Sequence, residues 1–483
     1  MNFVSGEFLL FITTTWLLFL ALPVRFRPAL LLLASYLFYA SWSVPFLIII
    51  LISTSVDYFA SKFIHSNPSP YKRKAALSAA LTLNLLILGF FKYCNFFLES
   101  SCSLFSILHV HHHLPAHLNI ILPLGISYYT FEAISYLVDT YRGEKPSNSW
   151  LEYNFYIMYF PHLISGPIIR FKELSPQYRI PLVNPSAERI TKGLELTILG
   201  YAYKVIIATN CSAIADPIFK NPSAFPVLLN YVAALAFTTQ VYFDFMGYTH
   251  IARGISLLFN IELPLNFNHP FSAGNISNFW ERWQISLTRW IRDYVFIPLG
   301  GTRRAYPRVL LNLFLVMLIC GIWHGAGWRY VIWGAYYGLA VVLYFLYRTV
   351  RSRIFAKHEN TVLENRAYKI GSTLLTFSTV AAACVIFRAA TLPDAMAMFA
   401  KLSMVPQGLS ELLYALQGHE MKWVALAAIL LACCFVGPWA EKMYYRSTIT
   451  LPVFYRVQMA TACALACWLL SASGIAPFIY FEF

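Results

Sequence analysis

His324 is the residue whose type and setting point most directly to chemistry. It lies in "LICGIWHGAGWRYVIWGAYYG" (residues 318–338), a stretch that is otherwise apolar, aromatic or glycine. Ionisable side chains are costly inside a membrane and tend to line functional cavities, and the glycines after His324 let another molecule approach closely. Because imidazole ordinarily titrates near neutrality, we expect His324 to act as a general base between the walls of Trp323 and Trp328. A hydrogen-bonded structural histidine is the alternative.

A second candidate site places arginines among tryptophans in "WERWQISLTRWIRD" (residues 280–293) and in the following "GGTRR". Arginine forks bind phosphate in a bidentate manner, and tryptophan stacks on flat ring systems. The pattern suits an anionic ligand with a ring system. The alternative is an interfacial helix whose arginines meet lipid headgroups. The candidate phosphate ligands are Arg282, Arg289, Arg292, Arg303 and Arg304.

The histidines of "HVHHHLPAH" (residues 109–117) form the one dense histidine cluster in the sequence. A zinc site is the functional alternative, but no acidic or cysteine partner stands at ligand spacing to them. We therefore expect a solvated, pH-responsive outer loop and no metal site. The nine cysteines lie mostly within apolar runs and form no C-x-x-C pair, which predicts small buried hydrophobic residues.

Four ionisable residues interrupt other apolar runs: Glu132, Asp139, Asp244 and His250. Each needs a partner if it is buried. We expect structural pairing between helices, with the lining of a polar tunnel as the alternative.

The elements that position these residues must be membrane helices. The chain is 58% hydrophobic and only 12% charged, against about 25% charged in a typical soluble domain. Long apolar runs recur from end to end, so the fold class is an all-α polytopic membrane protein. The net charge of +14 collects in short loops between these runs, as the positive-inside rule predicts, which argues against nucleic-acid binding. Alternation of basic and Lys/Arg-poor segments predicts about twelve crossings with both termini outside.

Three segments depart from simple crossings. Residues 28–41 and 45–61 are short for a helix that needs about 20 residues to span the bilayer. Residues 153–171 contain Pro161, Gly166 and Pro167 within an apolar run and suit a re-entrant element. Residues 260–307 alternate aromatics with arginines, which predicts helices at the cytoplasmic interface.

Several segments in order give the chain a family resemblance. The run from Gln240 to Arg304, followed by "CGIWHGAGWRYVIWG", resembles the membrane-bound O-acyltransferases, in the bacterial branch that acylates polysaccharides and cell walls. The segments "LPLGISYYTFEAISYLVDTYRG", "YFPHLISGPIIRF" and "VIFRAATLPDAM" are also similar to that branch. The resemblance covers most of residues 30–400.

The resemblance implies one membrane-embedded domain over residues 1–483, with a family-like core (30–400) and C-terminal transmembrane helices (401–483). It implies re-entrant and interfacial helices around a central cavity or tunnel. The histidine of the family's "WHG" motif is its invariant catalytic residue and corresponds to His324. The acyl donor reaches such an enzyme from the cytoplasm, as acetyl-CoA or an acyl-carrier protein, and the acceptor lies on the other side.

The chain departs from the family pattern at Gln284. The branch usually reads "RWHISLS" where this chain reads "RWQISLT", so a second family histidine is glutamine here. Glutamine still donates and accepts hydrogen bonds but takes no proton, which favours a single base at His324. The expected catalytic residues are thus His324 and Gln284. The expected substrate-binding residues are Trp323, Trp283, Arg282, Arg289, Arg292, Asp293, Arg303 and Arg304.

These features lead us to expect an O-acetyltransferase of the bacterial inner (cytoplasmic) membrane. It would take acetyl from acetyl-CoA, hold no bound cofactor, and act on a polysaccharide or peptidoglycan acceptor, directly or through an extracytoplasmic esterase-like partner protein. Membrane lipids surround it, and no nucleic acid is expected. The alternatives are transfer of D-alanine or another acyl group from a carrier protein, a lipid-linked glycan transporter or flippase, and a structural scaffold.

Overall fold

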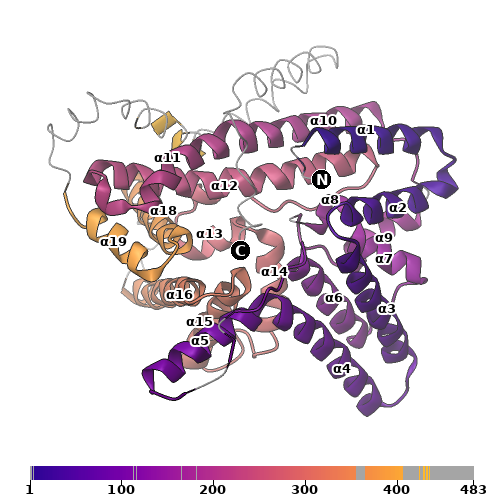
Figure 1. Cartoon of the computed structure of the whole chain (residues 1–483), viewed down its shortest axis with the longest axis horizontal. Coiled ribbons are helices and arrows are strands. Elements are labelled where there is room, and N and C mark those ends of the chain that lie inside the picture. The colour runs from indigo at the N-terminus through magenta and orange to yellow at the C-terminus, as the bar shows by residue number, and fades with distance from the viewer. Residues whose placement is uncertain are drawn as a thin grey trace. The chain divides into compact units, whose positions relative to one another are not determined.

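In the computed structural model, every regular element in the part of the chain that it describes is a helix (Figure 1). The described residues are 3, 5–111, 114–115, 117–164, 166–180, 182–354, 365–405, 424, 428–429, 431–432 and 434–435. These ranges contain no strand, so the predicted all-α fold is confirmed. The C-terminal helices expected within 401–483 fall almost wholly outside the described residues, and so do His112 and His113 of the histidine cluster.

The chain divides into two compact units, with boundaries inside α10 (Ala187–Tyr201) and α12 (Val227–Leu258). Unit 1 comprises Met1–Thr197 and Thr249–Pro264, and unit 2 comprises Ile198–Tyr248 and Leu265–Phe483. The expectation of one domain over the whole chain stays a prediction.

Several helices of unit 1 begin directly after a serine that caps their first turn. Ser5, Ser69 and Ser149 each accept a hydrogen bond from a backbone N–H in the first turn of the helix that follows, which satisfies donors that have no partner within the helix. The helices before the first boundary are α1 (Gly6–Ala21), α2 (Arg27–Ala40), α3 (Val44–Ser66), α4 (Pro70–Leu88), α5 (Cys94–Ile107), α6 (Ile126–Tyr141), α7 (Trp150–Met158), α8 (Phe160–Leu163) and α9 (Phe171–Arg179).

The segment at residues 153–171 is broken and buried. Helix α7 ends at Met158, the four-residue α8 follows, and residues 167–170 belong to no helix. Glu132 of α6 contacts two residues of this segment. Its Oε1 lies 3.3 Å from His162 Nδ1 and accepts a hydrogen bond of 3.1 Å from the Ile169 N–H. The expected pairing of Glu132 is confirmed, whereas the re-entrant path through a membrane stays a prediction.

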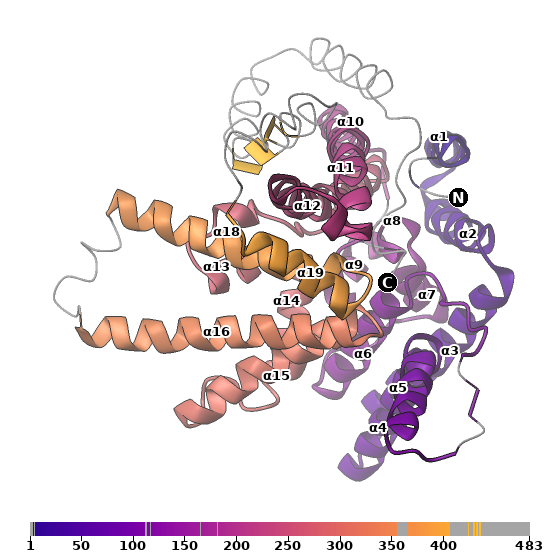
Figure 2. The same cartoon turned by 60° about the vertical axis from the view of Figure 1, so that its left-hand side comes forward.

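Unit 2 carries the predicted chemistry on a group of long and short helices. Helices α15 and α16 pack against each other, and α18 packs along α16. Figure 2 shows α16 and α18 running side by side and spreading apart toward residues 354 and 366. Besides the second part of α10 and most of α12, the unit contains the π-helical turns η3 (Ala202–Ala208) and η6 (Arg292–Phe296) and the helices α11 (Thr209–Lys220), α13 (Ile276–Arg282), α14 (Ile285–Ile291), α15 (Tyr306–His324), α16 (Trp328–Ile354), α18 (Arg366–Arg388) and α19 (Leu392–Leu402).

A buried ion pair joins two segments of unit 2. Lys204 Nζ in η3 lies 2.5 Å from Asp244 Oδ1 in α12, and both side chains are 1% exposed. In unit 1, Asp139 pairs with Arg142 at 3.7 Å near the end of α6, and His250 is buried. Structural pairing between helical segments is therefore confirmed for Asp244, although no local feature of the sequence marks Lys204 as its partner. The contact of Asp139 with Arg142, three positions on, is local to the end of α6 and does not join two helices.

Six helical segments of the described chain are long and apolar enough to cross a membrane. Helix α3, with 23 residues, extends about 35 Å at 1.5 Å per residue. The expectation that residues 45–61 are too short is therefore wrong, because the helix continues at both ends; α2, with 14 residues, is short as expected. The six are Val44–Ser66, Pro70–Ile107, Ala187–Lys220, Tyr306–His324, Trp328–Ile354 and Arg366–Arg388. The expected twelve crossings include residues outside the described ranges.

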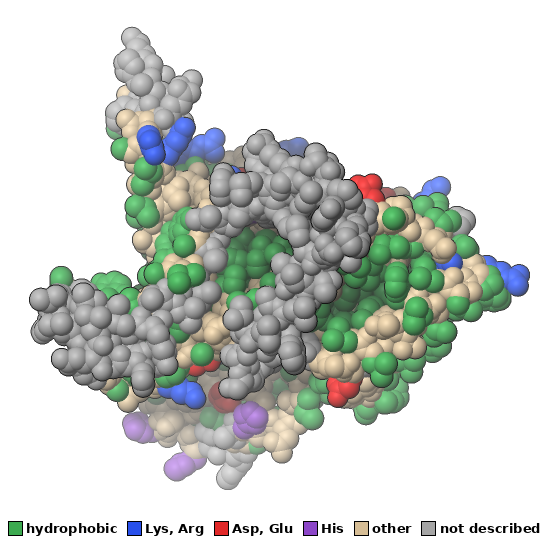
Figure 3. All heavy atoms as spheres, turned by 90° about the horizontal axis from the view of Figure 1, so that it is seen from above, with side chains coloured by type: hydrophobic (Ala, Val, Ile, Leu, Met, Phe, Trp, Pro, Cys, Tyr) green, Lys and Arg blue, Asp and Glu red, His purple; other side chains and the backbone are tan. Residues whose placement is uncertain are grey.

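Large apolar side chains lie exposed on these helices, as expected for contact with lipid. Phe59, Leu86, Ile107 and Leu375 are each at least 64% exposed. The face drawn in Figure 3 shows broad hydrophobic areas, with Lys and Arg gathered at a few places. Water is a poor solvent for such a surface, so the exposed residues support the same conclusion as the composition.

Candidate active site

His324 is the last residue of α15, at a tight bend between two helices that nearly touch. A Cβ placed at Gly321 would collide with the Tyr330 carbonyl oxygen and with Gly334 of α16. A Cβ at Gly325 would collide with the Tyr330 ring. The glycines around the "WHG" motif therefore let α16 fold back closely on α15, and this fixes the position of the imidazole.

Aromatic rings enclose the imidazole of His324, which is 3% exposed. Its ring centroid lies 4.9 Å from that of Trp323, 4.8 Å from that of Trp333 and 5.7 Å from that of Phe387. All three rings meet the imidazole edge to face. Helices α15, α16 and α18 thus each contribute one wall.

A small cavity of about 30 Å³ lies beside His324, roughly the volume of one water molecule. Aromatic side chains fill most of the space around the imidazole. A ligand larger than this volume can reach the imidazole only if some of these rings move. The lining is completed by Phe237, Val241, Phe271, Phe279, Trp280, Trp283, Tyr337, Val380 and Cys384.

Gln284, the departure from the family pattern, has an unusual environment. It precedes α14 with a left-handed backbone (φ 42°) and is 1% exposed. Neither its amide nitrogen nor its amide oxygen hydrogen-bonds to any residue that the structure describes. A buried amide without partners costs free energy, and backbone strain concentrates at functional sites. Both observations support a ligand-binding role for Gln284.

Asn266 fixes the backbone directly after this strained residue. Its carbonyl oxygen accepts from the Ile285 N–H at 2.9 Å, and its side-chain oxygen accepts from the Ser286 N–H at 3.2 Å and the Ser286 hydroxyl at 2.8 Å. The left-handed turn at Gln284 is therefore held by a second segment of unit 2. Sequence reasoning missed Asn266, since an isolated asparagine in "PLNFNHP" has no signature.

The structure brings some of the predicted site residues together and leaves others apart. Trp283 lines the cavity at His324 and Trp323 packs on the imidazole, whereas none of the five predicted arginines lines that cavity. Arg282 donates to the Ser272 hydroxyl at 2.9 Å, and Arg292 pairs with Asp293 at 2.7 Å. Arg289, Arg303 and Arg304 are exposed. Substrate binding by these residues stays a prediction.

The most informative residues that sequence reasoning missed are aromatic. Trp280 and Trp333 line the cavity with His324, and Phe387 packs against the imidazole from a segment more than sixty positions away. The sequence feature that could have indicated these residues is that they lie in segments that resemble the family. In a chain that is 17% aromatic, periodicity does not separate such residues from ordinary core residues.

Metal and disulfide chemistry find no support in the described residues. No group of three or more His, Cys, Asp and Glu side chains there is arranged to hold a metal ion. The described cysteines are free, and Cys211, Cys320, Cys384 and Cys434 are buried, as expected of small hydrophobic residues. Cys433, Cys463 and Cys467 lie outside the described ranges.

Comparison with known proteins gives a consistent result. Residues 123–363 match the model of MBOAT, the membrane-bound O-acyltransferase family. The chain is 37% identical to the probable alginate O-acetylase AlgI of Pseudomonas aeruginosa, over 86% of this chain and 79% of that protein. It is 37% identical to the peptidoglycan O-acetyltransferase of Helicobacter pylori, over 76% and 72%. It is 30% identical to the teichoic acid D-alanyltransferase of Bacillus subtilis, over 58% and 71%. Together with the six helical segments of the described chain that are long and apolar enough to cross a membrane, these matches establish that the chain belongs to the membrane-bound O-acyltransferase family and is a multi-pass membrane acyltransferase.

Proposed function

We propose that this acyltransferase moves an acetyl group from cytoplasmic acetyl-CoA across the bacterial inner membrane to a hydroxyl of peptidoglycan or an exopolysaccharide, directly or through an extracytoplasmic partner protein. The observation that carries the proposal is the enclosure of His324 by aromatic rings from three helices, in the motif that the family resemblance marks as catalytic. The site lies in a chain whose long relatives are named O-acetylase and O-acetyltransferase.

The chemistry assigned to His324 is general-base catalysis. An imidazole nitrogen takes the proton of the acceptor hydroxyl while the hydroxyl oxygen attacks the thioester carbonyl carbon. The carbon–sulfur bond then breaks, the thiolate of coenzyme A leaves, and the proton held by the imidazole neutralises it. General-base assistance contributes about 10²–10⁴-fold, so positioning inside the aromatic enclosure must supply much of the remaining acceleration.

Gln284 is proposed to bind the oxyanion or to orient a substrate. Its amide is buried and makes no hydrogen bond to a described residue, which leaves its N–H groups available to a ligand. One preorganised donor to an oxyanion contributes about 10²–10³-fold in turnover. Glutamine provides such a donor without taking part in proton transfer, in agreement with a single base.

The comparisons favour acetyl over D-alanyl as the transferred group. The two O-acetylating relatives align with 86% and 76% of this chain, whereas the D-alanyltransferase aligns with 58%. D-alanyl transfer from a carrier protein would require that carrier in the assay. Transfer from free acetyl-CoA, with no carrier present, separates the two functions.

The donor and the acceptor need separate experiments. Proteoliposomes containing the full chain and a hydroxyl acceptor on one side receive radiolabelled acetyl-CoA on the other, and acetyl transfer is measured. Arg303→Gln/Arg304→Gln should raise the KM for acetyl-CoA about tenfold or more, because charge-assisted hydrogen bonds to phosphate are lost. Arg308→Gln, a change at an exposed arginine of the same region, is the control.

Mass spectrometry of cell-wall and secreted glycans from a deletion strain identifies the acceptor. Loss of O-acetyl groups from peptidoglycan or from an exopolysaccharide is the expected result. Absence of transfer from acetyl-CoA, together with transfer from a D-alanyl carrier protein, would contradict the proposed donor. Glycan export that depends on the chain, without any acyl transfer, would favour a transporter.

A further inference from the structure

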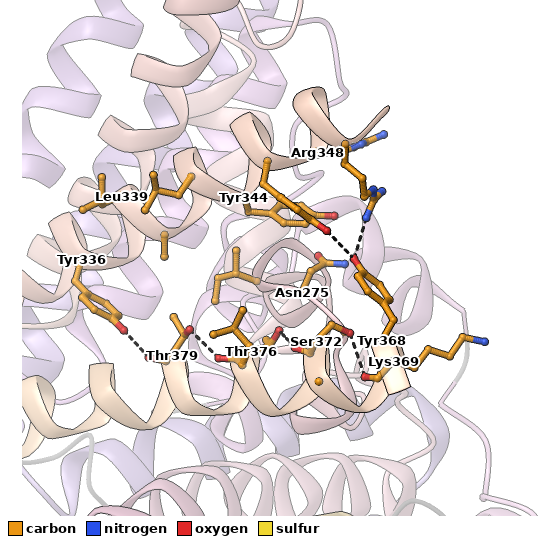
Figure 4. Close-up of a pocket in the computed structure, with 18 residues that line it drawn as sticks. Asn275, Tyr336, Leu339, Tyr344, Arg348, Tyr368, Lys369, Ser372, Thr376 and Thr379 are labelled. Carbon is orange, nitrogen blue, oxygen red and sulfur yellow. Dashed lines mark hydrogen bonds between the residues drawn. The ribbon is translucent and has the colours of Figure 1, made fainter. Parts of the chain in front are cut away.

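A cavity of about 1120 Å³ lies between α16 and α18. It is distinct from the small cavity at His324. None of its lining residues lines the His324 cavity. Figure 4 shows it as a groove along the two helices, with residues of α16 on one side and residues of α18 on the other. Nothing in the proposed acyl transfer uses this groove.

The two ends of the groove differ in polarity. Arg348, Arg351 and Lys369 lie at one end, and Arg351 donates a hydrogen bond of 3.0 Å to the Tyr368 hydroxyl. Arg348 and Lys369 are exposed, and in the described part of the chain neither forms an ion pair with a carboxylate. The other end is lined by apolar side chains, among them Leu339 and Leu375.

This polarity follows the membrane axis. Both helices are long and apolar enough to cross the bilayer, and the basic side chains lie near the ends of the two spans, at Arg348 of α16 and Lys369 of α18. Leu339 lies nine residues before Arg348, or about 13 Å along the helix. A ligand with a charged head at the interface and an apolar tail toward the bilayer centre matches this arrangement.

The groove also opens toward surfaces that lipid would cover. Leu339 and Leu343 are each 54% exposed and Leu375 is 71% exposed, although all three line the cavity. A water-soluble nucleotide gains little from such walls, whereas an acyl chain buries them at about 25 cal/mol per Å². Arg348 and Lys369, which form no ion pair with a carboxylate among the described residues, complement a phosphate.

We propose that the groove between α16 and α18 binds an anionic phospholipid of the surrounding bilayer. Its phosphate lies between Arg348 and Lys369, and one acyl chain runs along Leu339, Leu343 and Leu375. The same two helices carry Trp333 and Phe387 against His324, so the bound lipid lies between two of the helices that form the candidate active site. This proposal does not depend on which acyl group the enzyme transfers.

Native mass spectrometry of the full chain tests the charged end. The protein is delipidated in detergent and titrated with phosphatidylglycerol and, separately, with phosphatidylcholine. Wild type should retain phosphatidylglycerol preferentially, and Arg348→Gln/Lys369→Gln should weaken its binding about tenfold or more. The matched control is Arg353→Gln/Arg366→Gln, which removes one exposed arginine from each helix near the same ends but outside the groove. Control binding should stay within about twofold of wild type.

A second variant tests the path of the chain without changing charge. A Cβ added at Gly371, which lines the groove, meets no heavy atom within 4 Å, so this position has room for a side chain, and Gly371→Phe is chosen to occupy part of the groove. A phosphatidylglycerol with a photoreactive acyl chain should label peptides of α16 and α18 in wild type and label them less in Gly371→Phe. Thermal unfolding of every variant, followed by tryptophan emission, shows that the comparison is made between folded proteins.

Three results would overturn the proposal. One is equal loss of phosphatidylglycerol from both double variants, which would indicate general interfacial charge. Another is no preference of the wild type for phosphatidylglycerol over phosphatidylcholine. The third is displacement of the lipid by coenzyme A that depends on Arg348 and Lys369, which would show that the groove binds the acyl donor. The first two leave acetyl transfer untouched, so they are distinguishable from failure of the proposed function.

Discussion

The imidazole of His324 and the indole of Trp333 meet edge to face, with ring centroids 4.8 Å apart and planes at 78°. The contact joins the end of α15 to the second turn of α16, across a bend that the glycines of the "WHG" motif make possible. Trp333 therefore helps to determine where the imidazole lies when a substrate enters.

Replacing Trp333 should damage both the fold and the site. Trp333 is 6% exposed, and truncation of a buried tryptophan costs about 3–5 kcal/mol. We expect Trp333→Ala to lower the thermal unfolding midpoint and acetyl transfer together. Trp328→Ala, at a side chain 58% exposed on the same bend, is the matched control and should cost about 0.5 kcal/mol or less. Equal effects of the two variants would show that Trp333 has no special part in positioning the imidazole.

Gln284 should show opposite effects on stability and activity. Gln284→Leu removes a buried amide that has no partner in the described residues, so it should leave stability unchanged or raise it by about 1–3 kcal/mol. Loss of an oxyanion donor should lower turnover about 10²–10³-fold. Unfolding and acetyl-transfer assays on the same preparation measure both quantities.

Gln284→His is the companion variant, because it restores a hydrogen-bonding side chain and the residue usual in the resembling branch. It should keep substantially more activity than Gln284→Leu. Full activity in Gln284→Leu would mean that the amide contacts no reacting group.

The buried pair of Lys204 and Asp244 predicts strong coupling in a double-mutant cycle. Both side chains are 1% exposed, so Lys204→Met or Asp244→Leu alone leaves a buried charge and should cost about 3–5 kcal/mol. The double variant should recover much of this loss. Reversible unfolding in detergent measures the four species, and additive losses would show that the two charges do not interact.

Much of the fold could be predicted from the sequence because membrane helices need long apolar runs between polar loops. Apolar runs and basic loops identified a helical membrane protein, and proline-rich breaks marked the interrupted segment at residues 153–171. Helix ends followed the apolar runs less closely. Helix α3 extends past the apolar run because Lys62, His65 and Ser66 continue a regular helix although they are polar.

The site was predictable in its centre and not in its surroundings. His324 stands out because an ionisable residue in an apolar run is rare, and the motif carried the family resemblance. Lys204 and Asn266 gave no local signal, since their partners lie 40 and 20 positions away. Phe387 is one of many aromatics, and only the folded chain shows that it touches the imidazole.

The most direct test of the account is acetyl transfer by His324→Ala in proteoliposomes supplied with labelled acetyl-CoA. His65→Ala, at an exposed histidine near the end of α3, is the control. The account predicts that His324→Ala loses at least about a hundredfold in rate while remaining folded, and that His65→Ala transfers acetyl at the wild-type rate. Transfer at the wild-type rate by folded His324→Ala protein would contradict it.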